Sequence, residues 1–193
     1  MRRRTFDMLM STGGLVLAVA LIVAGSLAFV GYSFANNTVH KQLAQQRIFF
    51  PPKGPATASP EIGPYVNKFA GQQLVTGAQA EVYADHFIAV HLKEVAGGKT
   101  YSEVSTLSRA NPTDQALAGQ VQTLFRGETL RGLLLQAYAF WKIGQIALIG
   151  AVVAWAMAGV IGLLTILGFW HLRKVVPGAE LLAPRITAHA VPA

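Results

Sequence analysis

Residues 8–30, MLMSTGGLVLAVALIVAGSLAFV, contain no charged side chain and decide the fold class of this chain. A second uncharged run, IGQIALIGAVVAWAMAGVIGLLTILGFW, covers residues 143–170. A helix rises about 1.5 Å per residue, so the first run reaches roughly 34 Å, which is enough for a hydrocarbon core of about 30 Å. The second run is longer than one crossing needs, so we expect it to tilt or to stand above the bilayer. The sequence therefore predicts an all-α membrane protein with two transmembrane helices.

The composition agrees with this class. Of the 193 residues, 52% are hydrophobic and only 13% are charged, whereas a soluble domain carries about 25% charged residues. The chain has no cysteine, which excludes disulfides, thiolate metal sites and cysteine nucleophiles. The net charge of +7 would raise the question of nucleic acid in a soluble protein. No basic stripe interleaved with aromatic residues occurs, so we expect no nucleic-acid partner.

The positions of the basic residues predict the orientation of the two spans. Arg2, Arg3 and Arg4 precede the first span, and Arg173 and Lys174 follow the second. By the positive-inside rule, both termini lie in the cytoplasm and the protein crosses the plasma membrane twice. An alternative interpretation of the first span is a cleaved signal peptide, because the segment Ser33-Phe34-Ala35 has small residues at the −3 and −1 positions. The apolar run is longer than the h-region of such peptides, which favours an uncleaved anchor.

These features divide the chain into five parts. The outer two are a cytoplasmic N-terminus at residues 1–7 and a cytoplasmic tail at residues 171–193. We expect the transmembrane helices to be residues 8–34 and 141–170, because aromatic residues such as Tyr32, Phe34, Phe140 and Trp141 mark the ends of the two runs. Between them, residues 35–140 form an extracytoplasmic helical domain, with a proline-rich linker at residues 51–60.

Helix signals recur along the middle segment. The first helix is expected to continue to about Phe50 and to end at Pro51 and Pro52. Thr76 with Gln79, and Thr100 with Glu103, have the spacing of capping boxes.

The helix that opens at Thr76 is expected to run to Ala96 and to stop at Gly97 and Gly98. We expect Asn111 to cap the last helix, with a pause at Gly127 before the chain runs into the second span. No segment alternates apolar and polar residues over the length of a strand, so no sheet is predicted.

Small residues within the spans are spaced for helix packing, which in lipid depends on close approach of the backbones. The candidate contact residues recur every four positions in each span: Ala20, Ala24, Ala28, Gly150, Ala154, Ala158 and Gly162. Two interpretations remain open for these ladders. The spans pack on each other, or one ladder faces another subunit.

Few polar groups are candidates for chemistry. Arg126, Glu128 and Arg131 form a candidate polar contact, and Glu128 and Arg131 have the spacing of a helical ion pair. The alternative for this group is a contact with anionic headgroups or a partner subunit.

A second candidate cluster contains the residues that a metal site would need: Glu81, Asp85, His86, His91 and Glu94. On one helix, His86 and His91 lie about 140° apart, so they cannot share a metal ion. His91 falls in an apolar stripe typical of a core position. We predict no catalytic, cofactor-binding or metal-binding residue, and no cofactor.

Three segments resemble a family of small two-span membrane proteins from actinobacteria: QQRIFFPPKG, YADHFIAVHLKEVAGGKTYSEVS and LAGQVQTLFRGETLRGLLLQAYAFWKIGQIA. The resemblance covers most of residues 5–174 and implies the same two-span topology. Some similar sequences bear the label "aromatic ring-opening dioxygenase". Such an enzyme needs an iron facial triad, and the histidine spacing argues against one. The resemblance carries over no catalytic or binding residue.

Small size, few reactive groups and two packable spans lead to one functional hypothesis. We expect a membrane-anchored structural or accessory protein, not an enzyme, which contacts membrane lipid and assembles with itself or with other subunits of an envelope or respiratory complex. The alternative is an extracytoplasmic sensing or ligand-binding module that works through a partner. A remote alternative is a metal-dependent enzyme.

Overall fold

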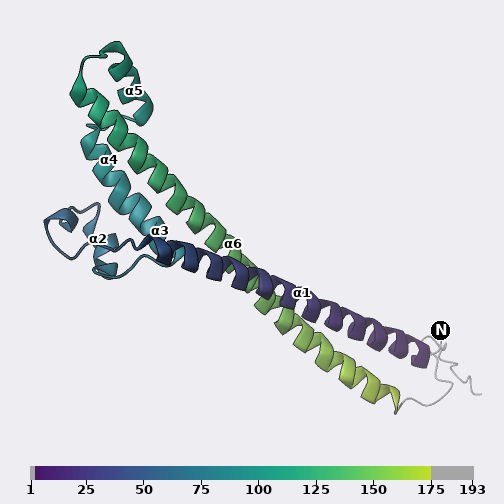
Figure 1. Cartoon of the computed structure of the whole chain (residues 1–193). Coiled ribbons are helices and arrows are strands. Elements are labelled where there is room, and N and C mark those ends of the chain that lie inside the picture. The colour runs from purple at the N-terminus through teal and green to yellow at the C-terminus, as the bar shows by residue number, and fades with distance from the viewer. Residues whose placement is uncertain (1–2, 175–193) are drawn as a thin grey trace, which may run out of the picture. The chain divides into compact units, whose positions relative to one another are not determined.

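The computed structural model describes residues 3–174, and within this range it is all-helical, with no β-strand. An isolated antiparallel bridge joins Phe49 to Gln73. The α-helices are α1 (Arg3–Gln46), α2 (Gly63–Val66), α3 (Gly77–Tyr83), α4 (Ala89–Val95), α5 (Tyr101–Ala110) and α6 (Gln115–Leu172) (Figure 1). Two 3₁₀ helices, η1 (Pro55–Thr57) and η2 (Asn67–Phe69), and one π-helix, η3 (Ala84–Ile88), complete the chain. The predicted all-α fold is confirmed, and α1 and α6 are long and apolar enough to cross a membrane.

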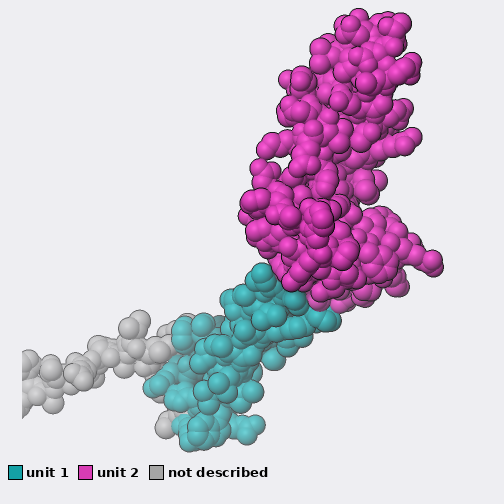
Figure 2. All heavy atoms as spheres, turned by 90° about the vertical axis from the view of Figure 1, so that its left-hand side faces the viewer, with its two compact units in different colours: residues 1–29, 148–193 teal, residues 30–147 magenta. Residues whose placement is uncertain are grey.

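The chain forms two compact units (Figure 2). Unit 1 contains residues 1–29 and 148–193, and unit 2 contains residues 30–147. In unit 1, α1 and α6 run antiparallel and side by side (Figure 1). Unit 2 contains all the shorter helices together with the remaining parts of α1 and α6.

The core of unit 2 is formed by apolar side chains from α1, α6 and the shorter helices. Val39 and Leu43 of α1 and Leu124 and Leu134 of α6 are each at most 2% exposed. The loop residue Leu74 is fully buried among them. The segment predicted as a linker takes part in this packing, because it contains η1 and buries Thr57.

α1 ends earlier than predicted, at Gln46 and not at Phe50. Arg47 adopts a left-handed φ of 53°, which breaks the helix before the prolines are reached. The chain then turns so that the Phe50 N–H donates to the Gln72 carbonyl at 2.9 Å. Phe50 is 1% exposed, so burial of this ring opposes continuation of the helix.

Both predicted capping boxes are present. The Thr76 hydroxyl accepts from the Gln79 N–H at 3.2 Å, and the Gln79 side chain accepts from the Thr76 N–H at 3.0 Å. α4 stops before Gly97 and Gly98, which have φ values of 57° and 81°, as the predicted stop requires. The π-helix η3, between α3 and α4, was not predicted, because its wider turn leaves no periodicity signal in so short a segment.

The structure of α6 corrects two predictions. Asp114, and not Asn111, caps the helix, because its Oδ1 accepts from the Ala116 N–H at 2.9 Å and the Leu117 N–H at 3.1 Å. The Asn111 side chain instead donates to the Leu107 carbonyl at the end of α5. α6 also runs without a pause through Gly127, where a larger residue would collide with Leu92.

The cap of α5 predicts a pH dependence. The pKa of Glu103 lies below its ordinary value of 4.5, chiefly because the Thr100 N–H donates to the carboxylate at 2.7 Å, with a second bond from the Thr100 hydroxyl. Since the folded pKa is lowered, this stabilisation is present above pH 4.5 and is lost as the pH falls through the lowered pKa. The protection of amides at the start of α5, measured as the exchange rate relative to the intrinsic rate at the same pH, should therefore fall at acid pH in the wild type and should lose this dependence in Glu103→Gln. An unchanged acid response in the variant would contradict the assignment.

Candidate interaction sites

The two apolar helices of unit 1 pack through one face of mostly small residues. Buried and half-buried positions recur at alternating spacings of three and four, which keeps one helix face against its neighbour. On α1 these positions are Ser11, Gly14, Ala18, Leu21, Gly25 and Ala28. On α6 they are Ala151, Ala154, Ala158, Ile161, Thr165 and Gly168.

Two reciprocal contacts show how closely these backbones approach. Thr165 lies over Gly14, and a Cβ added at Gly14 would be 2.5 Å from the Thr165 Oγ1. Ser11 lies over Gly168, where an added Cβ would collide with the Ser11 hydroxyl. Ser11 is 6% exposed and Thr165 is 5% exposed. Each helix therefore places a glycine opposite a hydroxyl-bearing side chain of the other helix, which lets the two backbones approach closely at this end of the pair.

The predicted ladder residues are divided between two environments. Ala158 is buried at 4% exposure, and Ala28, Ala154 and Gly162 are half-buried. Ala20, Ala24 and Gly150 are exposed. A four-residue ladder drifts around the helix, whereas the packed face follows an average repeat of 3.5 residues. The helix pair therefore includes only part of each ladder, and it uses Ser11, Gly14 and Thr165, which the ladders did not contain.

A stripe of small residues remains uncovered on α1. This stripe, termed the outer stripe, consists of Gly13, Ala20 and Ala24, all of which are exposed. At about 100° per residue these three positions fall within about 40° of one another on the helix. A Cβ added at Gly13 would meet no atom within 4 Å. The outer stripe thus has the composition of a helix-packing face and no packing partner among the described residues.

In unit 2, Arg131 joins two helical segments through a charged cluster. Its Nη2 donates to the Asp85 Oδ1 at 2.9 Å, and its Nη1 donates to the Glu128 Oε2 at 3.4 Å. The Glu128 contact is the one that the sequence spacing predicted, whereas Asp85 comes from η3 and was not predicted as a partner. The hydrogen bond that Arg131 donates to Asp85 raises the pKa of the guanidinium. A hydrogen bond with Glu81 raises the pKa of Tyr138, so five polar residues gather on this side of α6.

Removal of the Arg131 guanidinium should destabilise the protein modestly. Arg131→Gln should lower the free energy of unfolding by about 1 kcal/mol, because a charged hydrogen bond is lost at a site that is still a third exposed. Arg126 is exposed and makes no ion pair among the described residues, so Arg126→Gln is the matched control and should change stability by less than about 0.5 kcal/mol. Urea unfolding of both variants in detergent, followed by circular dichroism, measures the difference. If Arg131→Gln lowered the free energy of unfolding no more than Arg126→Gln does, the charged cluster would not be stabilising.

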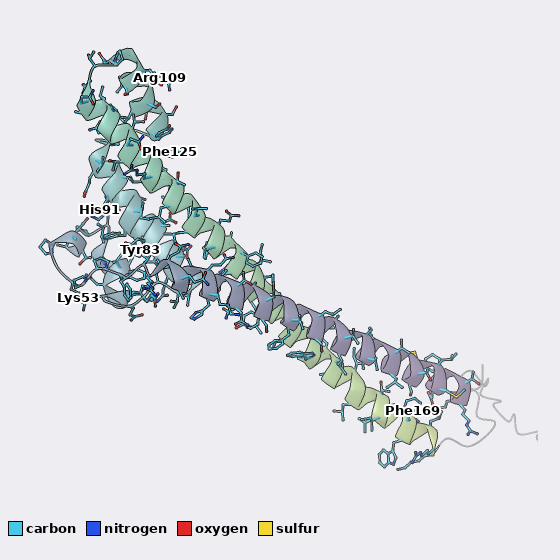
Figure 3. The ribbon with its side chains drawn as sticks, viewed as in Figure 1. Lys53, Tyr83, His91, Arg109, Phe125 and Phe169 are labelled. Carbon is cyan, nitrogen blue, oxygen red and sulfur yellow. The ribbon has the colours of Figure 1, made fainter. Side chains whose placement is uncertain are left out.

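His86 and His91, the two histidines of the candidate metal cluster, have separate neighbours. His86 stacks on Tyr65, with ring centroids 3.5 Å apart and an interplanar angle of 4°. His91 lies on α4 (Figure 3), and its Nδ1 is 2.7 Å from the Phe87 carbonyl oxygen. Across residues 3–174, no three His, Cys, Asp or Glu side chains are grouped so that they could hold a metal ion. His86 lies in η3, a π-helix that sequence periodicity did not indicate.

Comparisons of the chain with protein-family models, with curated proteins and with solved structures found no match. The functional argument therefore rests on three features of the chain itself. These are the paired apolar helices, the uncovered outer stripe and the surface of unit 2.

Proposed function

We propose that the protein is a membrane-anchored accessory protein that assembles with itself or with other subunits of a larger membrane complex and has no catalytic activity of its own. In this proposal, α1 and α6 span the plasma membrane, both termini are cytoplasmic and unit 2 lies outside. The positive charges that flank the two apolar runs support this orientation. Membrane lipid covers the remaining apolar surface of the spans.

The observation that carries the proposal is the outer stripe. Helix association in lipid depends on small residues that let backbones approach closely. Within the chain, α1 uses its other small face, Gly14, Ala18 and Gly25, to pack against α6. The outer stripe repeats this composition on a face that α6 does not cover. A helix from a second copy or from another subunit would bury it.

Single-cysteine cross-linking tests this proposal, because the chain has no native cysteine. Ala24→Cys, labelled with a maleimide that carries a benzophenone, should form a product heavier than the single chain when native membranes are irradiated, because the benzophenone inserts into C–H bonds of a neighbour and needs no cysteine there. Mass spectrometry of the affinity-isolated product would identify the partner. Ile22→Cys is the matched control, because Ile22 is 50% exposed and lies on the opposite side of the helix, so it should cross-link far less.

Two outcomes would contradict the proposal. One is that Ala24→Cys gives only the single chain while the same cysteine reacts fully with a monofunctional maleimide. The other is equal cross-linking at Ala24 and Ile22, which would indicate random collision in the membrane. If the heavier product contains only this chain, the protein assembles with itself. If it contains another protein in stoichiometric amount, the protein is a subunit of that complex.

A further inference from the structure

A groove in unit 2 lies between α1 and α6 and has a volume of about 580 Å³. Its apolar end contains Phe34, Phe140 and Ile143, and the first two rings meet edge to face with centroids 6.3 Å apart. Phe34 follows the first uncharged run by four residues, and Ile143 begins the second run. The buried residues Val39 and Leu43 also line the groove. A groove with this position would open to the bilayer at its apolar end.

Neutral polar groups line the groove farther from the spans. Gln42 and Gln46 lie roughly 12 and 18 Å along α1 from Phe34, at about 1.5 Å per residue. With Thr38 and with Gln136 of α6, they contribute three amides and one hydroxyl. None of these four side chains forms a hydrogen bond with another described residue.

The Thr38 hydroxyl has no hydrogen-bond partner among the described residues, unlike the hydroxyls of three other helical threonines in unit 2. The hydroxyls of Thr106, Thr123 and Thr129 each donate to the carbonyl four residues earlier, at 2.7–3.0 Å. Gln42, Gln46 and Gln136 are exposed and Thr38 is half-buried, so these four polar groups are accessible to a ligand. The amides supply both donors and acceptors, and the hydroxyl does the same.

The groove contains no charged side chain, and this determines the class of ligand that it fits. Lys41 and Lys142 adjoin groove residues in sequence but do not line it. The residues that line the groove supply no cation to pair with the phosphate of a phospholipid, so its polar part offers hydrogen bonds but no charge attraction. An uncharged lipid whose head carries a hydroxyl and ester carbonyls would match the amides and would leave its acyl chain along Phe34 and Phe140.

We propose that this groove binds a diacylglycerol drawn from the bilayer, with its glycerol and ester groups at Gln42, Gln46 and Gln136. A volume of about 580 Å³ lies within the usual range of small-molecule sites, roughly 300–1,000 Å³. The inference rests on the proposal that α1 and α6 span the membrane. It goes beyond that proposal by assigning a lipid to unit 2.

Photo-labelling of the full chain in phosphatidylcholine nanodiscs tests the inference. One sample contains a diacylglycerol with a diazirine in its acyl chain, and the other contains phosphatidylcholine with the same modified chain. The diacylglycerol probe should label peptides from residues 34–46 and 133–143 at least about fivefold more than the phosphatidylcholine probe, the difference that one hydrogen bond provides.

Three variants separate the groove from general lipid contact. Ala139→Trp fills the groove from an exposed position and should abolish the excess labelling. Gln136→Leu removes one amide and should reduce the diacylglycerol excess while leaving phosphatidylcholine labelling unchanged. Ala118→Trp, at an exposed site of α6 outside the groove, should have no effect. If circular dichroism shows that Ala139→Trp does not fold, Gln136→Leu decides the question.

Equal labelling of the groove by both probes would overturn the inference, as would a diacylglycerol signal that neither Ala139→Trp nor Gln136→Leu lowers. Both probes should still label residues 8–30 and 143–170 if these segments span the bilayer. A failure confined to the groove would thus leave the membrane anchor intact. Lack of labelling in the two spans would refute the anchor itself.

Discussion

Phe50→Ala should lower the free energy of unfolding by about 3–5 kcal/mol, the usual effect of deleting a buried aromatic ring. Phe50 is 1% exposed, and its ring centroid lies 5.1 Å from that of Phe69 and 5.3 Å from that of Tyr83. Tyr83 is half-buried, and this burial raises the pKa of its phenol above the ordinary value of 10.0. Without the Phe50 ring, the loop after α1 loses its aromatic contacts with η2 and α3.

The adjacent phenylalanine provides a matched control. Phe49 is 56% exposed, so Phe49→Ala removes the same ring from the same loop and should change stability by less than about 0.5 kcal/mol. Thermal and urea unfolding of the full chain in detergent should separate the two variants clearly. Similar destabilisation by both would contradict the assignment of Phe50 to the core of unit 2.

Gly25→Leu should separate the two apolar helices of unit 1. A Cβ at Gly25 would lie 2.7 Å from the Trp155 Nε1 and 3.2 Å from the Ala151 carbonyl oxygen. The indole can rotate, but the backbone carbonyl can move only if α6 moves, so a leucine forces the helices apart at this level. The cost of such overpacking is about 1–3 kcal/mol or more.

An engineered disulfide can measure this separation. At the Gly168 position an added Cβ would be 3.5 Å from the Ser11 Cβ, which is within the range of a disulfide. Ser11→Cys with Gly168→Cys should therefore oxidise readily within one chain. Adding Gly25→Leu should lower the oxidation yield, whereas Gly159→Leu, at a glycine with no atom near its Cβ, should not. An unchanged yield with Gly25→Leu would show that Gly25 does not set the helix spacing.

Local sequence signals predicted much of this fold. The capping boxes at Thr76 and Thr100 depend on contacts three residues apart, so the sequence contains all that they need. The end of α1 could not be found in this way. It depends on Phe50 packing against Phe69 and Tyr83, which are distant in the chain and invisible to a local pattern.

In the interaction sites too, contacts between residues close in sequence were predicted and contacts between distant residues were not. Glu128 and Arg131 are close in sequence and were predicted as a pair, whereas Asp85 is 46 residues from Arg131 and was not. For the spans, identical four-residue spacing drew attention to Ala20 and Ala24, but the packed face follows Gly14, Ala18 and Gly25. The three-and-four spacing of those residues was the signal that could have identified it.

The placement of unit 2 outside the membrane is the central claim of this account, and cysteine accessibility in intact cells tests it most directly. Ser102→Cys lies on exposed α5, and Ala179→Cys lies in the C-terminal segment beyond the described residues. A membrane-impermeant maleimide should label Ser102→Cys in intact cells and should label Ala179→Cys only after permeabilisation. Labelling of Ala179→Cys in intact cells, or protection of Ser102→Cys, would contradict the proposed topology.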